Sequence, residues 1–276
     1  MGSQFTIRPL ASIAEFKDCV RLQEETWGSG FSERVPATIL KVSQRVGGVT
    51  AGAYDDAGDL AGFVFGLTGV HDGEIVHWSD MLAVRPAFQD SGLGTRLKAY
   101  QRNALLSRGI VRMRWTFDPL EARNAHVNLN KLGAVASEYV EDMYGRTDSP
   151  LHQGIGTDRL VPTWTMDSAR VIERHVEGRP GPDSVGDRDA IPIFAVRAEG
   201  GLYLPSDPDL TVDSERILVP IPDSIQALRD ASADAALRWR AITRSVLTTY
   251  FDRGFEARDY FRRDGWGEYL LQESTT

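Results

Sequence analysis

The chain has 276 residues and a formal net charge of −8, from 31 Lys and Arg against 39 Asp and Glu. This length suits one large domain or two smaller ones. A hydrophobic content of 42% with 25% charged residues excludes wholesale disorder and a collagen-like chain. The acidic balance argues against a nucleic-acid partner, and the absence of any run of roughly 18 apolar residues argues against a membrane span.

The N-terminus and the single cysteine bear on where the protein works. No basic segment leading into an apolar stretch opens the chain, so no secretory signal is expected. Cys19 has no second cysteine with which to form an internal disulfide, and a reducing cytosol is its simplest setting. We therefore expect a cytoplasmic protein. The histidines show no metal-ligand spacing, and no metal site is predicted.

The first 166 residues alternate between strand and helix patterns. The expected order is a strand at 5–10, helices at 13–27 and 36–45, strands at 49–54, 60–68 and 75–84, a helix at 89–107, a strand at 112–117, a helix at 124–132, and strands at 135–140 and 159–166. This order predicts a mixed α/β sheet domain over residues 1–167.

Residues 168–190 are polar and rich in Gly, Pro and Asp, which is typical of a linker. Residues 191–276 are interpreted as a C-terminal α/β extension, with a strand at 216–221, a long helix from a cap at Asp223 to about Gly254, and strands at 255–261 and 267–272. The order of helix, glycine, strand and strand repeats that of residues 124–166, so the extension resembles a partial repeat. Roughly 80 residues hold little core, so we expect it to dock on the first domain or on a second copy, and a homodimer is left open.

One short segment carries the strongest chemical signal. Gln89, Gly92 and Gly94 form a Q-x-x-G-x-G pattern between the strand at 75–84 and a strong helix. Glycines let the backbone approach a ligand closely, and a helix start adds unpaired N–H groups and partial positive charge. The pattern therefore predicts a binding site for phosphate or diphosphate. It is not a Rossmann fingerprint, because Leu97 stands where a third glycine would be, and the Walker pattern is also absent.

Leu82, Val84 and Pro86 precede this turn, and the whole run resembles the acyl-CoA-binding motif of the GNAT-type N-acetyltransferase superfamily. The order of expected elements over residues 5–166 is similar to that fold. The resemblance implies that the end of the strand binds the pantetheine arm and that the glycine turn binds the pyrophosphate. It assigns acetyl-CoA or another short acyl-CoA, as cosubstrate, to Leu82, Ala83, Val84, Gln89, Asp90, Ser91, Gly92, Leu93, Gly94, Thr95 and Arg96.

Two further basic residues follow on the same helix. By the same resemblance, Lys98 and Arg102 lie with Arg96 near the ribose phosphate of the cosubstrate. The alternative interpretation is a solvated helix face.

The resemblance extends in part to the helix at 124–132. Ala125, Lys131 and Gly133 agree with the family pattern A-x-x-L-Y-x-K-x-G-F, while Leu129 and Ala134 stand at its Tyr and Phe positions. In the family, that tyrosine protonates the departing CoA thiolate. Leu129 has no ionisable group and cannot protonate the thiolate. Either another donor or water provides this proton, or the protein no longer catalyses transfer.

Acyl transfer to an amine needs a base for the amine, a hydrogen-bond donor for the oxyanion and an acid for the thiolate. Glu74, His77 and Asp80, on the strand before the turn, are candidates for the base, and the main chain near Val84 for the donor. His77 and Asp80 point to opposite faces of a regular strand unless a bulge intervenes. For either residue, a structural or surface role is the alternative.

Two residues further along are candidates for contacts with the acceptor. Tyr144 is predicted as a substitute acid or an acceptor contact, with a buried structural tyrosine as the alternative. Arg159 is predicted to bind an acceptor carboxylate, with a structural ion pair to Asp158 as the alternative.

These features predict an enzyme, an acyl-CoA-dependent N-acyltransferase of the EC 2.3.1 class. It would move an acetyl or other short acyl group, such as succinyl, to a primary amine of a small molecule by direct attack. A weaker resemblance, carried by Asn128, Asn130, Tyr144 and residues 157–160, is to a long GNAT subgroup associated with N-acylamino-acid metabolism, and it implies an amino acid as acceptor. The alternatives are a non-catalytic acyl-CoA-binding or sensing protein and a protein lysine or N-terminal acetyltransferase.

Overall fold

The computed structural model describes residues 5–28, 30–145, 154–179, 181 and 190–274. These residues form two compact units, one extending to Trp115 and the other beginning at Thr116. Each unit combines helices with a β-sheet. The mixed α/β fold class expected from the sequence is thus confirmed.

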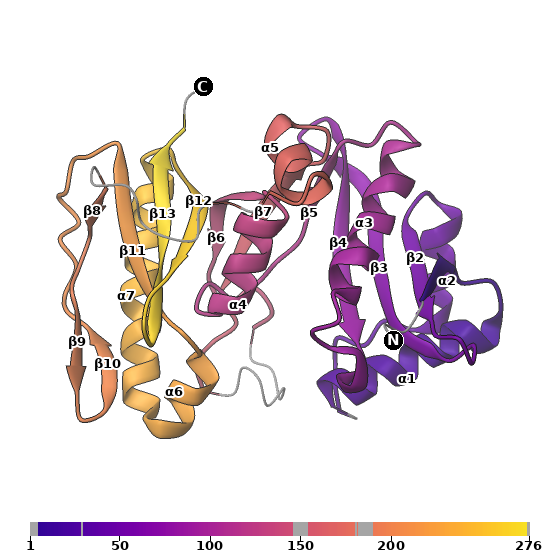
Figure 1. Ribbon diagram of the computed structural model, residues 1–276, viewed down its shortest axis with the longest axis horizontal. Helices are drawn as coiled ribbons and strands as arrows, with labels where there is room; N and C mark the ends of the chain where they lie inside the picture. Colours follow the sequence, from indigo (N-terminus) through magenta and orange to yellow (C-terminus); the bar gives the residue numbers. More distant parts are fainter. Residues whose placement is uncertain (1–4, 29, 146–153, 180, 182–189, 275–276) are drawn as a thin grey trace. The chain divides into compact units, whose positions relative to one another are not determined.

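The first unit is a sheet with helices on both faces (Figure 1). Its elements are β1 (Thr6–Pro9), α1 (Ile13–Trp27), α2 (Ala37–Arg45), β2 (Val49–Tyr54), β3 (Leu60–His71), β4 (Glu74–Val84), α3 (Leu93–Leu106) and β5 (Arg112–Arg114). Strands β1 to β4 pair antiparallel in chain order, and β5 runs parallel to β4.

Alternation along β3 explains the two layers of helices. Phe63 and Phe65 pack with α1 and α2, whereas Val64 packs with Leu93 and Leu97 of α3. This is the alternation expected of a strand that is buried on both faces.

Helix α3 begins four residues later than the sequence predicts. The expected helix over 89–107 is wrong at its start, because Asp90 and Gly92 have φ angles of +61° and +78°, which a right-handed helix excludes. A single 3₁₀ turn, Pro86–Phe88, precedes them. The glycine turn is therefore a turn in its own right, placed directly before α3.

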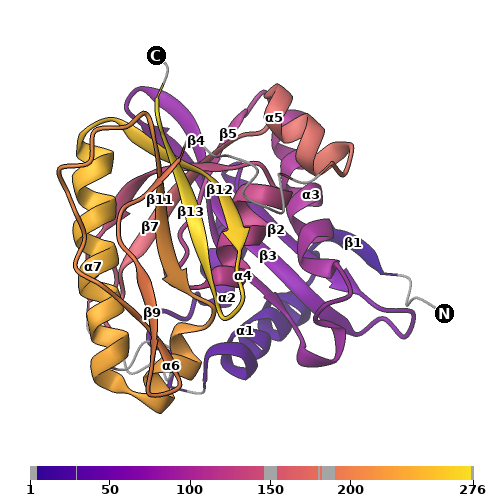
Figure 2. The ribbon, with the colours of Figure 1, turned by 60° about the vertical axis from the view of Figure 1, so that its left-hand side comes forward.

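The second unit is a larger sheet whose strands come from both sides of residue 167 (Figure 2). Its strands lie in the order β7-β6-β12-β13-β11-β8, and β9 and β10 form a separate hairpin. Its elements are α4 (Ala122–Ala125), a π-helical turn η2 (His126–Lys131), β6 (Val135–Val140), β7 (Arg159–Thr165), α5 (Ala169–Val171), a π-helical turn η3 (Ile172–Val176), β8 (Ile191–Pro192), β9 (Val196–Glu199), β10 (Leu202–Pro205), β11 (Arg216–Pro222), α6 (Ile225–Ala231), α7 (Ala233–Asp252), β12 (Phe255–Arg262) and β13 (Trp266–Glu273).

One hydrophobic core runs through the second unit. Leu129 and Leu160 belong to the same buried cluster as Trp239 and Tyr250 of α7. The expected docking of the C-terminal extension on the preceding chain is therefore confirmed. The limits 1–167, 168–190 and 191–276, drawn from the order of elements, stay a prediction, and residues 180 and 182–189 of the expected linker lie outside the described residues.

The long C-terminal helix expected from the sequence is two helices. Ser232, with φ −159° and ψ 107°, ends α6, and its side chain accepts a hydrogen bond from the main-chain N–H of Ala235 to start α7. Ser224 and not Asp223 caps α6. A serine competes with the backbone for hydrogen bonds and so favours a cap over a helix interior.

The two strand pairs β6–β7 and β12–β13 meet edge to edge. Each pair is antiparallel, and each follows a helix and a glycine, Gly133 or Gly254. The junction includes the pair Ala257↔Ala136 and the buried Asn130 amide, which bonds to the main-chain N–H and C=O of Tyr260 at 2.9 and 2.7 Å.

Among the helices in the described residues, none has the length and apolar character needed to cross a bilayer.

Candidate functional site

Strand β4 changes its alternation at Asp80. The hydroxyl of Ser79 faces α3 and bonds to Gln101 of that helix at 2.9 Å, whereas Met81 packs on the opposite face with α1 and α2. Residues two apart in a regular strand share a face. Asp80 is therefore the extra residue of a β-bulge, and the register with β3 shifts at this point.

The second half of β4 presents main-chain groups without a strand beside them. Strand β5 pairs with β4 only at Val76, His77 and Trp78. Beyond Trp78, in the part of the chain that the structure describes, only β3 pairs with β4. The N–H and C=O groups that point away from β3 can therefore pair with an extended ligand. Leu82, Ala83 and Val84, predicted to bind a pantetheine arm, lie on this open edge.

The glycine turn connects this edge to the start of α3. Gly92 is the N-terminal cap residue of α3, and no side chain caps the helix there. The first N–H groups of a helix have no partner inside it, and here they add to the positive end of the helix dipole. A Cβ on Gly92 would meet no atom within 4 Å, so open space lies in front of the turn. An anion fits this position.

The side chains of the turn hold its shape. Gln89 donates to the main-chain oxygen of Val84 at 3.4 Å, and Ser91 donates to that of Phe88 at 2.6 Å. Arg96 bonds to the carbonyl of Phe5 at 2.9 Å and lies over the Phe5 ring. Asp90, Leu93, Gly94 and Thr95 complete the predicted set, which the structure brings together at one end of α3.

Lys98 does not lie where the resemblance implies. Its side chain is buried on the sheet side of α3, and its Nζ lies 2.7 Å from the hydroxyl of Ser79. It therefore faces neither solvent nor a ribose phosphate. The reason is helical periodicity, because Lys98 follows Leu97 and precedes Gln101, which are both buried against the sheet.

Asp80 and His77 differ sharply in their surroundings. Asp80 is exposed as a residue, yet desolvation of its carboxyl raises the pKa, against the opposing effect of a hydrogen bond with Trp78. A raised pKa makes the carboxylate a better proton acceptor. Glu74, the third candidate, pairs with Arg112 at the end of the strand.

His77 is completely buried, and both ring nitrogens are engaged. Its Nδ1 lies 2.9 Å from the hydroxyl of Thr68, and its Nε2 lies 3.0 Å from Nε2 of Gln101. Burial lowers the pKa of His77 to about 3, with smaller contributions from the charges of Lys98 and Arg108. The ring is therefore neutral at pH 7 and is held as a link between β3 and α3. This geometry favours Asp80 over His77 as the base.

The depressed pKa of His77 predicts acid sensitivity. In the unfolded chain His77 binds a proton near the ordinary histidine pKa of 6.5, but in the folded chain its pKa is about 3. The contribution of neutral His77 to the free energy of unfolding is therefore fully present above pH 6.5. As the pH falls below 6.5, the free energy of unfolding decreases by up to about 1.4 kcal/mol per pH unit. We expect urea unfolding between pH 7 and pH 5 to show a shallower decline in the His77→Gln variant. Replacement of the exposed His71 by Gln is the control, and an equal change in both variants would contradict the assignment.

Tyr144 and Arg159 lie together in the second unit. The guanidinium carbon of Arg159 lies 5.2 Å from the centroid of the Tyr144 ring. The Tyr144 hydroxyl lies 2.8 Å from that of Thr116, and 40% of the tyrosine surface is exposed. Tyr144 is thus not the buried structural residue of the alternative interpretation. The Arg159 guanidinium lies 3.9 Å from the carboxylate of Asp118.

Asp158 has a different partner from the one considered in the sequence. Its fully buried carboxylate accepts hydrogen bonds from Arg244 at 2.8 and 2.9 Å and from the Tyr139 hydroxyl. Burial raises the pKa of this carboxyl, but these hydrogen bonds outweigh it and lower the pKa. Arg159 bonds instead to the main-chain oxygen of Asp158 at 2.8 Å.

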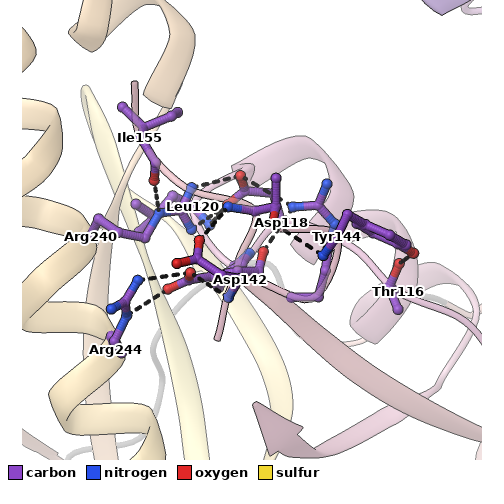
Figure 3. A network of polar contacts seen from close by, with 12 residues as sticks. Thr116, Asp118, Leu120, Asp142, Tyr144, Ile155, Arg240 and Arg244 are labelled. Atoms are coloured by element: carbon purple, nitrogen blue, oxygen red, sulfur yellow. Dashed lines mark hydrogen bonds and ion pairs between the residues drawn. The ribbon is translucent and has the colours of Figure 1, made fainter. Parts of the chain in front are cut away.

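A second buried ion pair lies beside this one. Arg240 donates two hydrogen bonds to Asp118, at 2.9 and 2.7 Å, and a third to the carbonyl of Ile155 at 3.0 Å (Figure 3). Sequence analysis did not single out this pair, and it placed Lys98 near a ribose phosphate, not against the sheet. The available signal was a charge inside an apolar stripe, since Arg240 follows Ala236 and Trp239 at helical spacing.

Among the described residues, no group of three or more His, Cys, Asp or Glu side chains is arranged to hold a metal ion. The site therefore consists, in the first unit, of the open β4 edge, the bulge at Asp80 and the glycine turn. Tyr144 and Arg159 form a separate cluster within the second unit.

No family model and no curated protein matches the chain, but several solved structures do. A ribosomal-protein-alanine N-acetyltransferase from Escherichia coli is 17% identical over 60% of this chain and 96% of its own, with a TM-score of 0.47. A GNAT-family acetyltransferase from Streptococcus pneumoniae is 16% identical over 58% and 98%, with a TM-score of 0.46. A Salmonella typhimurium protein described as an acetyltransferase, with its cofactor acetyl-CoA, is 17% identical over 60% and 96%, with a TM-score of 0.47. All three are described as acetyltransferases.

Proposed function

We propose that this protein is an N-acyltransferase that moves an acetyl or other short acyl group from CoA to a primary amine. The observation that supports this most is the glycine turn, which places the start of α3 at the end of an open strand edge. The turn suits a diphosphate, and the β4 edge suits an extended amide-containing arm. A CoA thioester combines these two groups.

The proposed reaction needs no covalent enzyme intermediate. The amine nitrogen attacks the thioester carbonyl, and main-chain N–H groups of β4 near Leu82 to Val84 stabilise the oxyanion. The C–S bond then breaks, the amide is released, and the proton lost by the amine balances the proton gained by the CoA sulfur. Asp80 is proposed as the base, acting directly or through water, because it lies in the bulge beside this edge and its pKa is raised.

The Asp80→Asn variant tests this role. We expect kcat to fall on the order of 100-fold or more, the usual contribution of a general base, while the dissociation constant for acetyl-CoA stays within a factor of two. The matched control is Asp72→Asn, which removes an exposed carboxylate from the β3–β4 turn. Equal kcat values for Asp80→Asn and the parent protein would exclude Asp80 as the base.

The acceptor is proposed to be a small molecule that carries a carboxylate as well as an amine, such as an amino acid. The pairing of the Arg159 cation with the exposed Tyr144 ring supports this choice. A guanidinium binds a carboxylate in two-point fashion, and the tyrosine hydroxyl can donate a hydrogen bond. The lone Cys19 supports a cytoplasmic setting. A homodimer stays a prediction.

Release of CoA distinguishes the candidate functions. A thiol assay with acetyl-CoA and succinyl-CoA is run against amino acids, other amines and lysine-containing peptides. CoA release that requires a small amine supports the proposal, and release that requires a peptide supports a protein acetyltransferase. Binding of acetyl-CoA without release by any acceptor supports the sensing protein, for which the absence of a tyrosine at Leu129 is the motivating observation.

A further inference from the structure

Lys98 has an unusual environment for a lysine. Its side chain is buried, with 8% of the residue surface exposed. The Nζ atom lies 2.7 Å from the Ser79 hydroxyl, 3.8 Å from the sulfur of Met113 and 4.0 Å from the centroid of the Trp115 ring. Burial lowers the pKa of Lys98 to about 7. A lysine is almost never buried in this way without a carboxylate beside it.

Within the described residues, no carboxylate forms an ion pair with the Lys98 amine, and burial is the sole cause of its lowered pKa. The nearby hydroxyl of Ser79 is shared with Gln101, a neutral amide, at 2.9 Å. His77, the nearest titratable group in this network, is neutral at pH 7 because its pKa is lowered. A positive charge at Lys98 would therefore be only partly compensated by the protein.

Lys98 lies where β4 and β5 diverge. The last paired residues are Trp78 on β4 and Arg114 on β5. The next residues are Ser79 and Trp115, and both contact the Lys98 amine. The bulge at Asp80 begins one residue further along β4. The amine thus lies at the closed end of the open β4 edge that is proposed to bind the pantetheine arm.

We propose that Lys98 contacts the sulfur atom of bound CoA and protonates the leaving thiolate. This inference rests on the proposed function and names a group for its missing acid. As the C–S bond breaks, the electron pair moves to sulfur, and the Lys98 ammonium gives it a proton to form the CoA thiol. The neutral amine regains a proton from the one lost by the acceptor, so the cycle balances. A cation without a full counter-charge stabilises the developing thiolate.

A sulfur-specific binding measurement tests this proposal. We compare CoA with desulfo-CoA, in which hydrogen replaces the thiol, by calorimetry at pH 6.5, where most of the Lys98 amine carries its proton. The parent protein is expected to bind CoA at least tenfold more tightly than desulfo-CoA. In Lys98→Met the affinity for desulfo-CoA is unchanged and the preference for CoA is lost. In Lys98→Arg, which keeps the charge, part of the preference returns.

Matched measurements separate this contact from a structural role. Lys17→Met removes an exposed lysine from α1 and keeps the full preference. Lys98→Met is expected to melt at or above the parent temperature, since methionine fills the space without an uncompensated charge. A parent protein with no preference, or a Lys98→Met variant that keeps it, overturns the inference and leaves the acyl-CoA site standing. A parent protein that binds neither ligand overturns the proposed function itself.

Discussion

Replacement of Gly92 by Glu is expected to weaken CoA binding on the order of 100-fold or more, measured by calorimetry. Gly92 is the cap residue of α3 and has a φ angle of +78°. A glutamate there places a negative charge in the open space before the helix, where we expect the diphosphate. Like charges in the same site repel. The double variant Gly92→Glu, Gly94→Glu adds a second carboxylate next to Leu82 and is expected to abolish measurable binding.

Gly73→Glu is the matched control for this experiment. Gly73 has a φ of +79°, and a Cβ there would also meet no atom within 4 Å. The two single variants therefore carry the same backbone strain and the same added charge. We expect similar melting temperatures for both and normal CoA binding for Gly73→Glu alone. If the Gly92→Glu variant binds CoA as tightly as the parent protein, the glycine turn is not the phosphate-binding site and the proposed function is wrong.

The Arg240→Met variant is expected to lose about 3–5 kcal/mol of unfolding free energy in the second unit, because it leaves the buried Asp118 carboxylate without its bidentate partner. For a unit of this size, the melting temperature should fall on the order of 10 °C. Calorimetric or fluorescence-detected thermal unfolding measures the change. The carbonyl of Ile155 also loses its donor, which adds to the loss.

Two further variants identify the cause of this loss. Arg238→Met, on the same helix, removes an exposed cation 3.7 Å from Asp207 and is expected to cost no more than about 1 kcal/mol. Asp118→Asn combined with Arg240→Met removes both charges and is expected to recover part of the stability lost in Arg240→Met. If Arg238→Met and Arg240→Met melt at the same temperature, the buried pair does not stabilise the unit.

The parts of the fold predicted well from the sequence are those set by local patterns. The hairpin of β2 and β3 was expected from its polar connector at 55–59, and the structure gives β2 at Val49–Tyr54 and β3 from Leu60. The turn before α3 was predicted because Gly92 and Gly94 combine with a strand and a helix whose periodicity is clear, and phosphate binding by this turn stays a prediction. Ser232 was missed because the apolar spacing continues across it, and a single serine carries little weight against that pattern.

The parts of the site that were not predicted depend on contacts between residues distant in the sequence. The bulge at Asp80 is visible only through the pairing of β4 with β3 and the opposite faces of Ser79 and Met81. Asp118 and Arg240 are 122 residues apart. Lys98 looks like any surface lysine on a helix until the sheet is placed beneath it. No local pattern encodes these tertiary placements.

The common core of the second unit has a consequence for how this chain can change over evolution. Helix α7 contributes Arg240 and Arg244, which bond to Asp118 and Asp158, and these two aspartates lie next to Arg159 in space or in sequence. We propose that this region recognises the acceptor, and its structure depends on contacts with α7. Recombination could therefore not exchange this region without also exchanging the C-terminal third of the chain. We expect substitutions that change the preferred amine to be inherited together with compensating substitutions in α7. These lie more than eighty positions downstream of the residues that α7 contacts.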